Sequence, residues 1–249
     1  MINLALSLLA GVAAFALFRL TFVHAAWEAL LPGLLAAGGA YFLLARRTMR
    51  QLEAVMGAAQ KELMGTAPGS KKDRDARLDR AEKVVERGFA LSRWQFLVAS
   101  NVHAQLGVFR YWKEDYDGAE PHLEKAYVGH WIARCMLGAL AYRKKDKARM
   151  EKVFEGAVGS SPKEGLLWST YAWCEEKLGD RDAAIAALVR GAEKVPADER
   201  LKANLERLRN GKKPRMDSYA EQWWQLALES PPMQQPNPFA GGRRAGYRR

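Results

Sequence analysis

The chain has 249 residues, enough for one or two small domains, and carries 39 Lys and Arg against 28 Asp and Glu, a net charge of +11. This basic excess favours contact with phosphates, either of lipid headgroups or of nucleic acid. Its two cysteines, Cys135 and Cys174, have no CxxC spacing, which excludes a disulfide framework and favours a reduced compartment.

Two uncharged stretches near the N-terminus predict a pair of membrane-spanning helices. Residues 2–18 contain no charge and only two polar side chains, and residues 29–45 contain no charge at all. With their flanks, each reaches about 20 residues, roughly 30 Å of helix, which matches the hydrocarbon core of a bilayer. The short connector permits only an antiparallel hairpin, so we expect residues 1–47 to form a transmembrane hairpin.

Small residues at four-residue spacing predict how the two spans pack. They are Ser7 and Gly11 in the first span and Ala29, Gly33 and Ala37 in the second. Such stripes let two helix backbones approach closely in lipid.

Basic residues beside the second span predict the orientation of the hairpin. Arg46, Arg47 and Arg50 follow it directly and are candidates for contact with anionic lipid or phosphate. By the positive-inside bias, both termini should be cytoplasmic, and the composition suggests a bacterial inner membrane. A cleavable signal peptide ending at residues 23–25 is the alternative, disfavoured because residues 1–18 contain no Lys or Arg and a second span follows.

The segment after the spans predicts two more helices. Residues 48–64 continue the second span, with apolar positions at three- and four-residue steps that would lie on the headgroups or pack on the next helices. Residues 65–70 then form a short linker. Residues 73–93 look like the second half of a degenerate repeat.

One pattern occurs three times between residues 100 and 196: a small residue (once replaced by Met), a bulky apolar residue four positions later, and a small residue three positions after that. The matches are Ala119/Leu123/Ala126, Met150/Phe154/Ala157 and Ala184/Leu188/Gly191. Successive copies begin 31 and 34 residues apart, a period typical of helix-turn-helix solenoids.

This pattern resembles the tetratricopeptide repeat (TPR), over roughly residues 76–211. The most complete copy, residues 131–164, has Leu137-Gly138, Phe154 and Pro162 at the family's offsets. Departures are Met150 in place of a small residue and Arg110, Ala141 and Glu175 where an aromatic is usual. We therefore expect an all-α chain, in which the transmembrane hairpin is followed by a TPR-like α-solenoid at residues 71–211. It would have about three repeats, a flanking half-repeat and a capping helix at residues 198–210.

The resemblance implies that the first helix of each repeat lines a concave groove. The groove candidates are Asn101, Gln105, Val108, Tyr111, Trp112, Ile132, Met136, Tyr142, Arg143, Leu166, Trp173 and Lys177. Family members that bind chaperone C-termini hold a carboxylate with basic and amide side chains, whereas the matching positions here are Ala104, Val108, Met136, Leu166 and Thr170. The groove should therefore be largely apolar with an aromatic rim (Trp112, Tyr142 and Trp173), suited to an amphipathic helix or an extended apolar segment. Alternatively, these aromatics fill gaps between helices.

Residues 212–230 predict a tryptophan-containing helix. Ser218 and Glu221 have the spacing of a capping box before a helix at 219–229 that carries Trp223 and Trp224. Two indoles would not stay exposed, so this helix should dock on the solenoid or dip into the membrane interface.

Residues 231–249 predict a disordered basic tail. Arg243, Arg244, Arg248 and Arg249 lie among Gly and Tyr with no acid nearby. They could contact anionic lipid, touch RNA, or simply keep the chain soluble.

Nothing in the chain predicts catalysis or a cofactor. The four histidines have no metal-ligand spacing, and there is no phosphate-binding glycine loop or nucleophile elbow. We expect a non-enzymatic, membrane-anchored scaffold that binds a protein partner, without cofactor or metal. The alternatives are a membrane-associated RNA- or ribosome-binding factor and an envelope-assembly factor.

Overall fold

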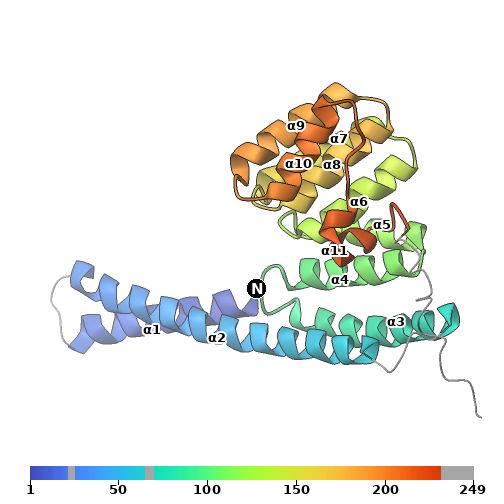
Figure 1. Cartoon of the computed structure of the whole chain (residues 1–249). Helices are drawn as coiled ribbons and strands as arrows, with labels where there is room; N and C mark the ends of the chain where they lie inside the picture. Colours follow the sequence, from blue (N-terminus) through green and yellow to red (C-terminus); the bar gives the residue numbers. More distant parts are fainter. Residues whose placement is uncertain (22–25, 65–69, 231–249) are drawn as a thin grey trace, which may run out of the picture.

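A computed structural model describes residues 1–21, 26–64 and 70–230. Within them the chain is entirely helical, with eleven α-helices, two short 3-10 helices and no strand (Figure 1). The all-α expectation is therefore confirmed. Residues 65–69 of the expected 65–70 linker and the 231–249 tail lie outside the described residues.

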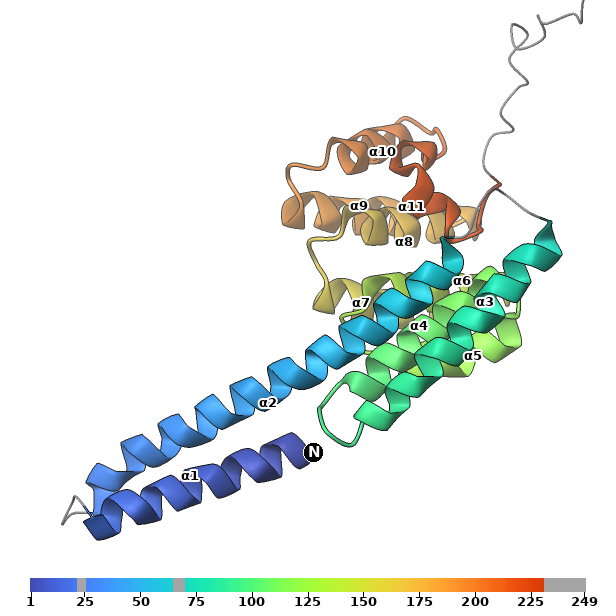
Figure 2. The same cartoon turned by 90° about the horizontal axis from the view of Figure 1, so that it is seen from below.

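The helices follow one another with short connections. Their bounds are α1 Ile2–Thr21, α2 Ala26–Leu63, α3 Lys71–Glu86, η1 Arg87–Leu91, α4 Val98–Trp112, α5 Tyr116–Lys125, α6 Trp131–Arg143, α7 Lys147–Ser160, α8 Gly165–Lys177, α9 Arg181–Lys194, α10 Glu199–Arg209, η2 Asp217–Tyr219 and α11 Glu221–Trp224. Figure 2 shows α1 and the first half of α2 projecting as a hairpin away from the other helices.

The hairpin packs through the small-residue stripe expected from sequence. A Cβ built on Gly11 would lie 2.7 Å from the Ala37 Cβ and 2.9 Å from the Gly33 carbonyl oxygen. Ser7 and Ala29 are buried in the same contact. The two backbones are thus closer than larger side chains would permit.

Both hairpin helices are long and apolar enough to cross a membrane, and only 11% of each apolar window is buried. Leu9, Val12 and Leu35 are 64–67% exposed. A core helix of a soluble protein would bury such side chains, whereas a lipid-facing helix leaves them on its surface. The orientation remains a prediction, and the alternative cleavage site at residues 23–25 lies outside the described residues.

Beyond the hairpin, α4/α5, α6/α7 and α8/α9 form packed pairs, and α4, α6, α8 and α10 contact one another in turn. The turn inside each pair has the same geometry. One residue adopts a left-handed conformation: Glu114 (φ 66°), Lys145 (58°) and Gly179 (91°). The next residue is an aspartate whose side chain accepts a hydrogen bond of 2.9–3.0 Å from an amide three residues on: Asp115, Asp146 and Asp180. These turns are spaced 31 and 34 residues apart, so the sequence period is also a period of local structure.

Within the first two pairs, a glycine of the first helix packs against a bulky residue of the second. A Cβ on Gly107 would lie 2.7 Å from the Leu123 side chain, and one on Gly138 would lie 2.5 Å from the Phe154 ring. Leu123 and Phe154 are completely buried. The matched Gly and bulky positions of the sequence pattern therefore meet in space.

The helices between hairpin and pairs differ partly from expectation. The second half of α2 packs along α3, with Leu52 and Ala59 buried, so residues 48–64 pack on protein through this face. The helix expected at 73–93 begins earlier, at a capping box of Ser70 and Asp73, and changes to 3-10 geometry at Arg87. This 3-10 segment packs closely on α4, since a Cβ on Gly88 would lie 2.8 Å from the Val102 side chain.

Candidate partner-binding groove

The first helices of the pairs form one continuous face, and the chain crosses this face itself. After α10, the segment that we call the strap, residues 216–229, turns back across α8 and reaches α4 and α6 (Figure 1). Four strap side chains are at most 2% exposed: Met216, Tyr219, Trp223 and Leu226. The face formed by the first helices is therefore covered by a segment of the chain itself.

The strap begins on α10 and α8. The Asn204 side-chain oxygen accepts a hydrogen bond of 2.7 Å from the Arg215 amide, just before the strap. The Tyr219 hydroxyl lies 2.7 Å from the Ser169 hydroxyl, and the Arg200 guanidinium lies 4.4 Å from the centre of the Tyr219 ring. These contacts fix the register of the strap.

The middle of the strap is held by two tryptophans and a carboxylate. The rings of Trp173 on α8 and Trp223 on the strap meet edge to face, 5.3 Å apart. Both indole N–H groups donate to Glu229, one to each carboxylate oxygen and each at 3.1 Å. The buried aromatic pair thus keeps both polar atoms satisfied.

The far end of the strap is held through its backbone. The Tyr111 hydroxyl of α4 donates to the Leu226 carbonyl at 2.6 Å, and the Arg143 guanidinium of α6 donates to the Ala227 carbonyl. Burial raises the pKa of Tyr111, which keeps the hydroxyl a donor. Groups of the groove therefore satisfy carbonyls that a helix would otherwise bond internally.

The expected helix at 219–229 is wrong. Of the two expected placements of this segment, on the solenoid or in the membrane interface, the structure has it packed on the helical pairs. The strap contains a 3-10 turn and the four-residue α11, interrupted by Ala220 (φ 50°) and Ala227 (φ 49°). The expected capping box does not form, because Ser218 donates to the Arg215 carbonyl instead. This irregular path lets one short segment contact three first helices, α4, α6 and α8.

The twelve groove candidates divide by burial. Five are buried: Val108, Tyr111, Met136, Leu166 and Trp173. Five are half-buried: Asn101, Gln105, Trp112, Ile132 and Tyr142. Arg143 and Lys177 are exposed. Of these, Tyr111, Arg143 and Trp173 bond or stack directly with the strap.

The sequence interpretation omitted two strap contacts, Asn204 and Arg200, because α10 was expected to act only as a cap. One signal was present: Asn204 stands beside Leu205 in the apolar row of α10, and it is 1% exposed. A buried amide in such a row needs a partner, here the strap.

The expected aromatic rim is only partly assembled. Tyr142 meets Trp173 edge to face at 5.4 Å, whereas Trp112 packs against Phe109 of its own helix at 6.0 Å. Lys177 lies 5.0 Å from the centre of the Trp173 ring. The rim therefore centres on Trp173.

Open space remains on both sides of the strap. A cavity of about 560 Å³ adjoins Trp112 and Trp224, and one of about 470 Å³ adjoins Leu166 and Gln222. Two cavities thus adjoin the strap.

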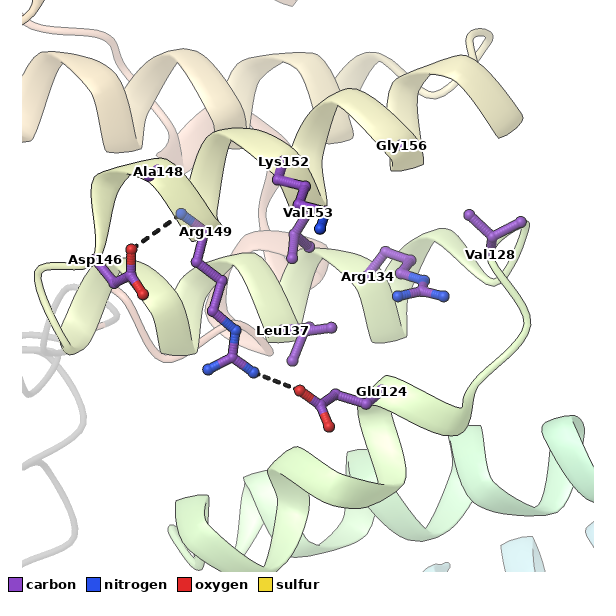
Figure 3. Close-up of a pocket in the computed structure, with 10 residues that line it drawn as sticks. All are labelled: Glu124, Val128, Arg134, Leu137, Asp146, Ala148, Arg149, Lys152, Val153 and Gly156. Atoms are coloured by element: carbon purple, nitrogen blue, oxygen red, sulfur yellow. Dashed lines mark hydrogen bonds and ion pairs between the residues drawn. The ribbon is translucent and has the colours of Figure 1, made fainter.

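A third cavity, about 620 Å³, lies away from the strap among α5, α6 and α7 (Figure 3). The Arg149 side chain on α7 reaches past α6 to Glu124 on α5 at 2.6 Å, and Asp146 caps α7. Glu124 and Arg149 form an ion pair, and the lining mixes both signs of charge. This favours a structural role for the ion pair.

The remaining candidate residues lie elsewhere. Arg46, Arg47 and Arg50 are exposed at the end of the hairpin, while Arg243, Arg244, Arg248 and Arg249 lie outside the described residues. No group of three or more metal-binding side chains occurs in the part of the chain that is described. Burial raises the pKa of both Cys135 and Cys174, which keeps them as thiols.

No protein-family model, curated protein or solved structure matches the chain. The resemblance of residues 76–211 to tetratricopeptide repeats therefore rests on the repeated residues and the repeated turns. Membership of that family stays a prediction.

Proposed function

We propose that this chain is a membrane-anchored, non-catalytic adaptor, in which the hairpin holds a TPR-like α-solenoid at the membrane and the solenoid binds a protein partner. The solenoid assignment is supported by the three matching turns and by the contacts of Gly107 with Leu123 and Gly138 with Phe154. Anchoring is supported by the exposed apolar surface of α1 and α2. The positions of Arg46, Arg47 and Arg50 support a cytoplasmic solenoid.

The observation that carries the proposal is the strap. It indicates the chemistry that the groove accepts: aromatic or aliphatic side chains at the spacing of Tyr219, Trp223 and Leu226, with carbonyls that meet Tyr111 and Arg143. A partner segment with this pattern would compete with the strap for the same donors. On this proposal, the strap covers the apolar face in the absence of the partner and is displaced when the partner binds.

Competition tests the proposal directly. A photo-crosslinking residue is placed at Arg143 or Lys177, beside the strap, and at Lys152 on α7 as a control on the opposite helix of a pair. In native membranes, we expect crosslinks to one protein from the groove positions and none of that protein from Lys152. A synthetic peptide of residues 216–230 should reduce these crosslinks, whereas a scrambled peptide should not. Crosslinks that ignore the peptide, or that occur equally from Lys152, would contradict a groove-bound partner.

A further inference from the structure

The loop between η1 and α4, residues 92–97, joins the beginning of α1 and so ties the helical pairs to the hairpin. The amides of Ile2 and Asn3 donate to the carbonyl oxygens of Arg93 and Trp94 at 3.0 and 3.2 Å. The N-terminal ammonium also donates to the Arg93 carbonyl. Figure 2 shows this loop beside the N-terminus. The first amides of α1 would otherwise have no acceptor within the helix, and the carbonyl oxygens of the loop accept their hydrogen bonds.

A network of buried hydrogen-bonded side chains fixes how the loop contacts the hairpin. The Asn3 side-chain amide donates to the Thr48 hydroxyl at 2.9 Å and to the Gln95 side-chain oxygen at 3.1 Å. The Gln95 amide donates in turn to the Tyr41 hydroxyl at 2.9 Å. Asn3, Thr48 and Gln95 are at most 9% exposed. The loop, the start of α1 and the middle of α2 therefore form one unit.

A cavity of about 310 Å³ opens in this unit, lined by Arg47 and Gln51 of α2 and by Arg93 and Trp94 of the loop, among others. An adjoining cavity, about 390 Å³, is lined by Arg46, Arg47 and Arg50. No acidic residue lines either cavity, whereas each of the other three cavities described contains at least one. No ion pair within the described ranges involves Arg46, Arg47, Arg50 or Arg93, although most other arginines there form one.

The two cavities lie where the exposed apolar surface of the hairpin ends and the arginines of α2 begin. Phe42 and Leu43, 60% and 66% exposed, come just before the arginines on α2. In the loop, Phe96 and Leu97 are 43% and 49% exposed, and Leu97 adopts a left-handed conformation (φ 62°) that leucine rarely takes. Apolar side chains, an indole and arginines without an ion pair at one level are what a membrane interface accommodates, and the Arg93 guanidinium lies 5.9 Å from the centre of the Trp94 ring.

We propose that Arg47 and Arg93 bind the phosphate of an anionic phospholipid headgroup in this cavity, with Phe96 and Leu97 entering the interface beside it. Arginine forks suit phosphate oxygens, and the two guanidiniums approach from different elements, so one headgroup would join α2 to the loop. The site deepens the proposed function and rests on it, because the hairpin must be in a bilayer. A lipid held there fixes how the groove is oriented above the membrane.

The test compares full-length chain reconstituted in phosphatidylcholine vesicles with and without phosphatidylglycerol, then counts the lipids retained by the detergent-extracted protein in native mass spectrometry. We expect one phosphatidylglycerol retained preferentially. The retention constant should fall about fivefold for Arg47→Gln or for Arg93→Gln and about 25-fold for the double variant. Arg87→Gln, a neighbouring unpaired arginine that lines neither cavity, is the matched control and should retain the lipid.

Three outcomes would overturn the site. In the first, all variants including the double one retain phosphatidylglycerol equally. In the second, Arg87→Gln loses it as strongly as Arg93→Gln does. In the third, millimolar inorganic phosphate displaces it completely, which would make the cavity a phosphate site without lipid selectivity. Flotation separates failure of the site from failure of the anchor: chain that floats with phosphatidylcholine vesicles but selects no anionic lipid refutes only the site, whereas chain that does not float refutes both.

Discussion

At the scale of single residues, Glu175 is a carboxylate buried within the helical pairs. It is 0% exposed, its carboxylate has no hydrogen-bond partner among the described residues, and its ion-pair contact is Lys147 at 3.5 Å. Lys147 also pairs with Asp180 at 2.6 Å, so it keeps a partner if Glu175 is removed. We expect Glu175→Leu to stabilise the protein at pH 7 by about 1–2 kcal/mol, measured by thermal unfolding in detergent. Glu151→Leu, at the half-buried partner of the same lysine, should change stability by less than about 0.5 kcal/mol.

The stability difference between Glu175→Leu and the wild type should depend on pH in a defined direction. Burial raises the pKa of Glu175 in the folded state above its unfolded value of about 4.3. The folded state then binds the extra proton, so the contribution of Glu175 to stability is fully present below about pH 4.3 and is lost as the pH rises through the folded value. The advantage of Glu175→Leu should therefore shrink as the pH falls from 7 toward 4. A constant difference would mean that Glu175 is not desolvated.

His122 gives the opposite dependence. Its Nδ1 lies 3.0 Å from that of His103, and burial, with Arg110 and His103 nearby, lowers the pKa of His122 to about 4. Its contribution to stability is therefore present above the unfolded value of about 6.5 and is lost as the pH falls toward 4. Between pH 7 and pH 5, we expect the melting temperature of the wild type to fall more than that of His122→Gln, and the two proteins to respond alike above pH 7. Parallel curves throughout would contradict this assignment.

At the scale of elements, the hairpin depends on the close approach of α1 and α2. A leucine at Gly11 would meet the Gly33 carbonyl and the Ala37 Cβ, so Gly11→Leu should separate the helices toward the roughly 8–10 Å of ordinary pairs. Spin labels at the exposed positions Leu8 and Leu34 would report this as a longer distance, because the two buried native cysteines do not label. Gly39→Leu is the control, since nothing lies within 4 Å of a Cβ at that position. Equal distances in the two variants would refute the packing.

The strap is the second element whose contribution can be measured. Trp223 is completely buried against Trp173, so Trp223→Ala should lower the free energy of unfolding by about 3–5 kcal/mol. Gln222→Ala, at the exposed neighbour on the same short helix, should have almost no effect. An unchanged melting temperature after Trp223→Ala, or after deletion of residues 216–249, would show that the strap does not stabilise the fold.

At the scale of the whole molecule, the features predicted well are those set by local residue patterns. The small-residue stripe fixed the hairpin contact, and Asp115, Asp146 and Asp180 mark turns whose spacing repeats the sequence period. The path of the strap could not be predicted, because Ser218 and Glu221 favour a capping box locally while distant donors such as Tyr111 bind its carbonyls. Tertiary contacts of this kind override local propensity. The junction of Asn3 with Gln95 is equally invisible in sequence, since 92 residues separate its members.

The central claim, that the hairpin lies in lipid while the helical pairs lie in water, is tested most directly by cysteine labelling in native membranes. Leu9→Cys and Leu35→Cys probe the hairpin, Lys152→Cys probes the pairs, and Cys135 and Cys174 are too buried to react. With a charged, water-soluble maleimide, we expect Lys152→Cys to label rapidly and the two hairpin cysteines to stay unlabelled. Labelling of Leu9→Cys and Leu35→Cys as fast as Lys152→Cys would place the hairpin in water and contradict the account.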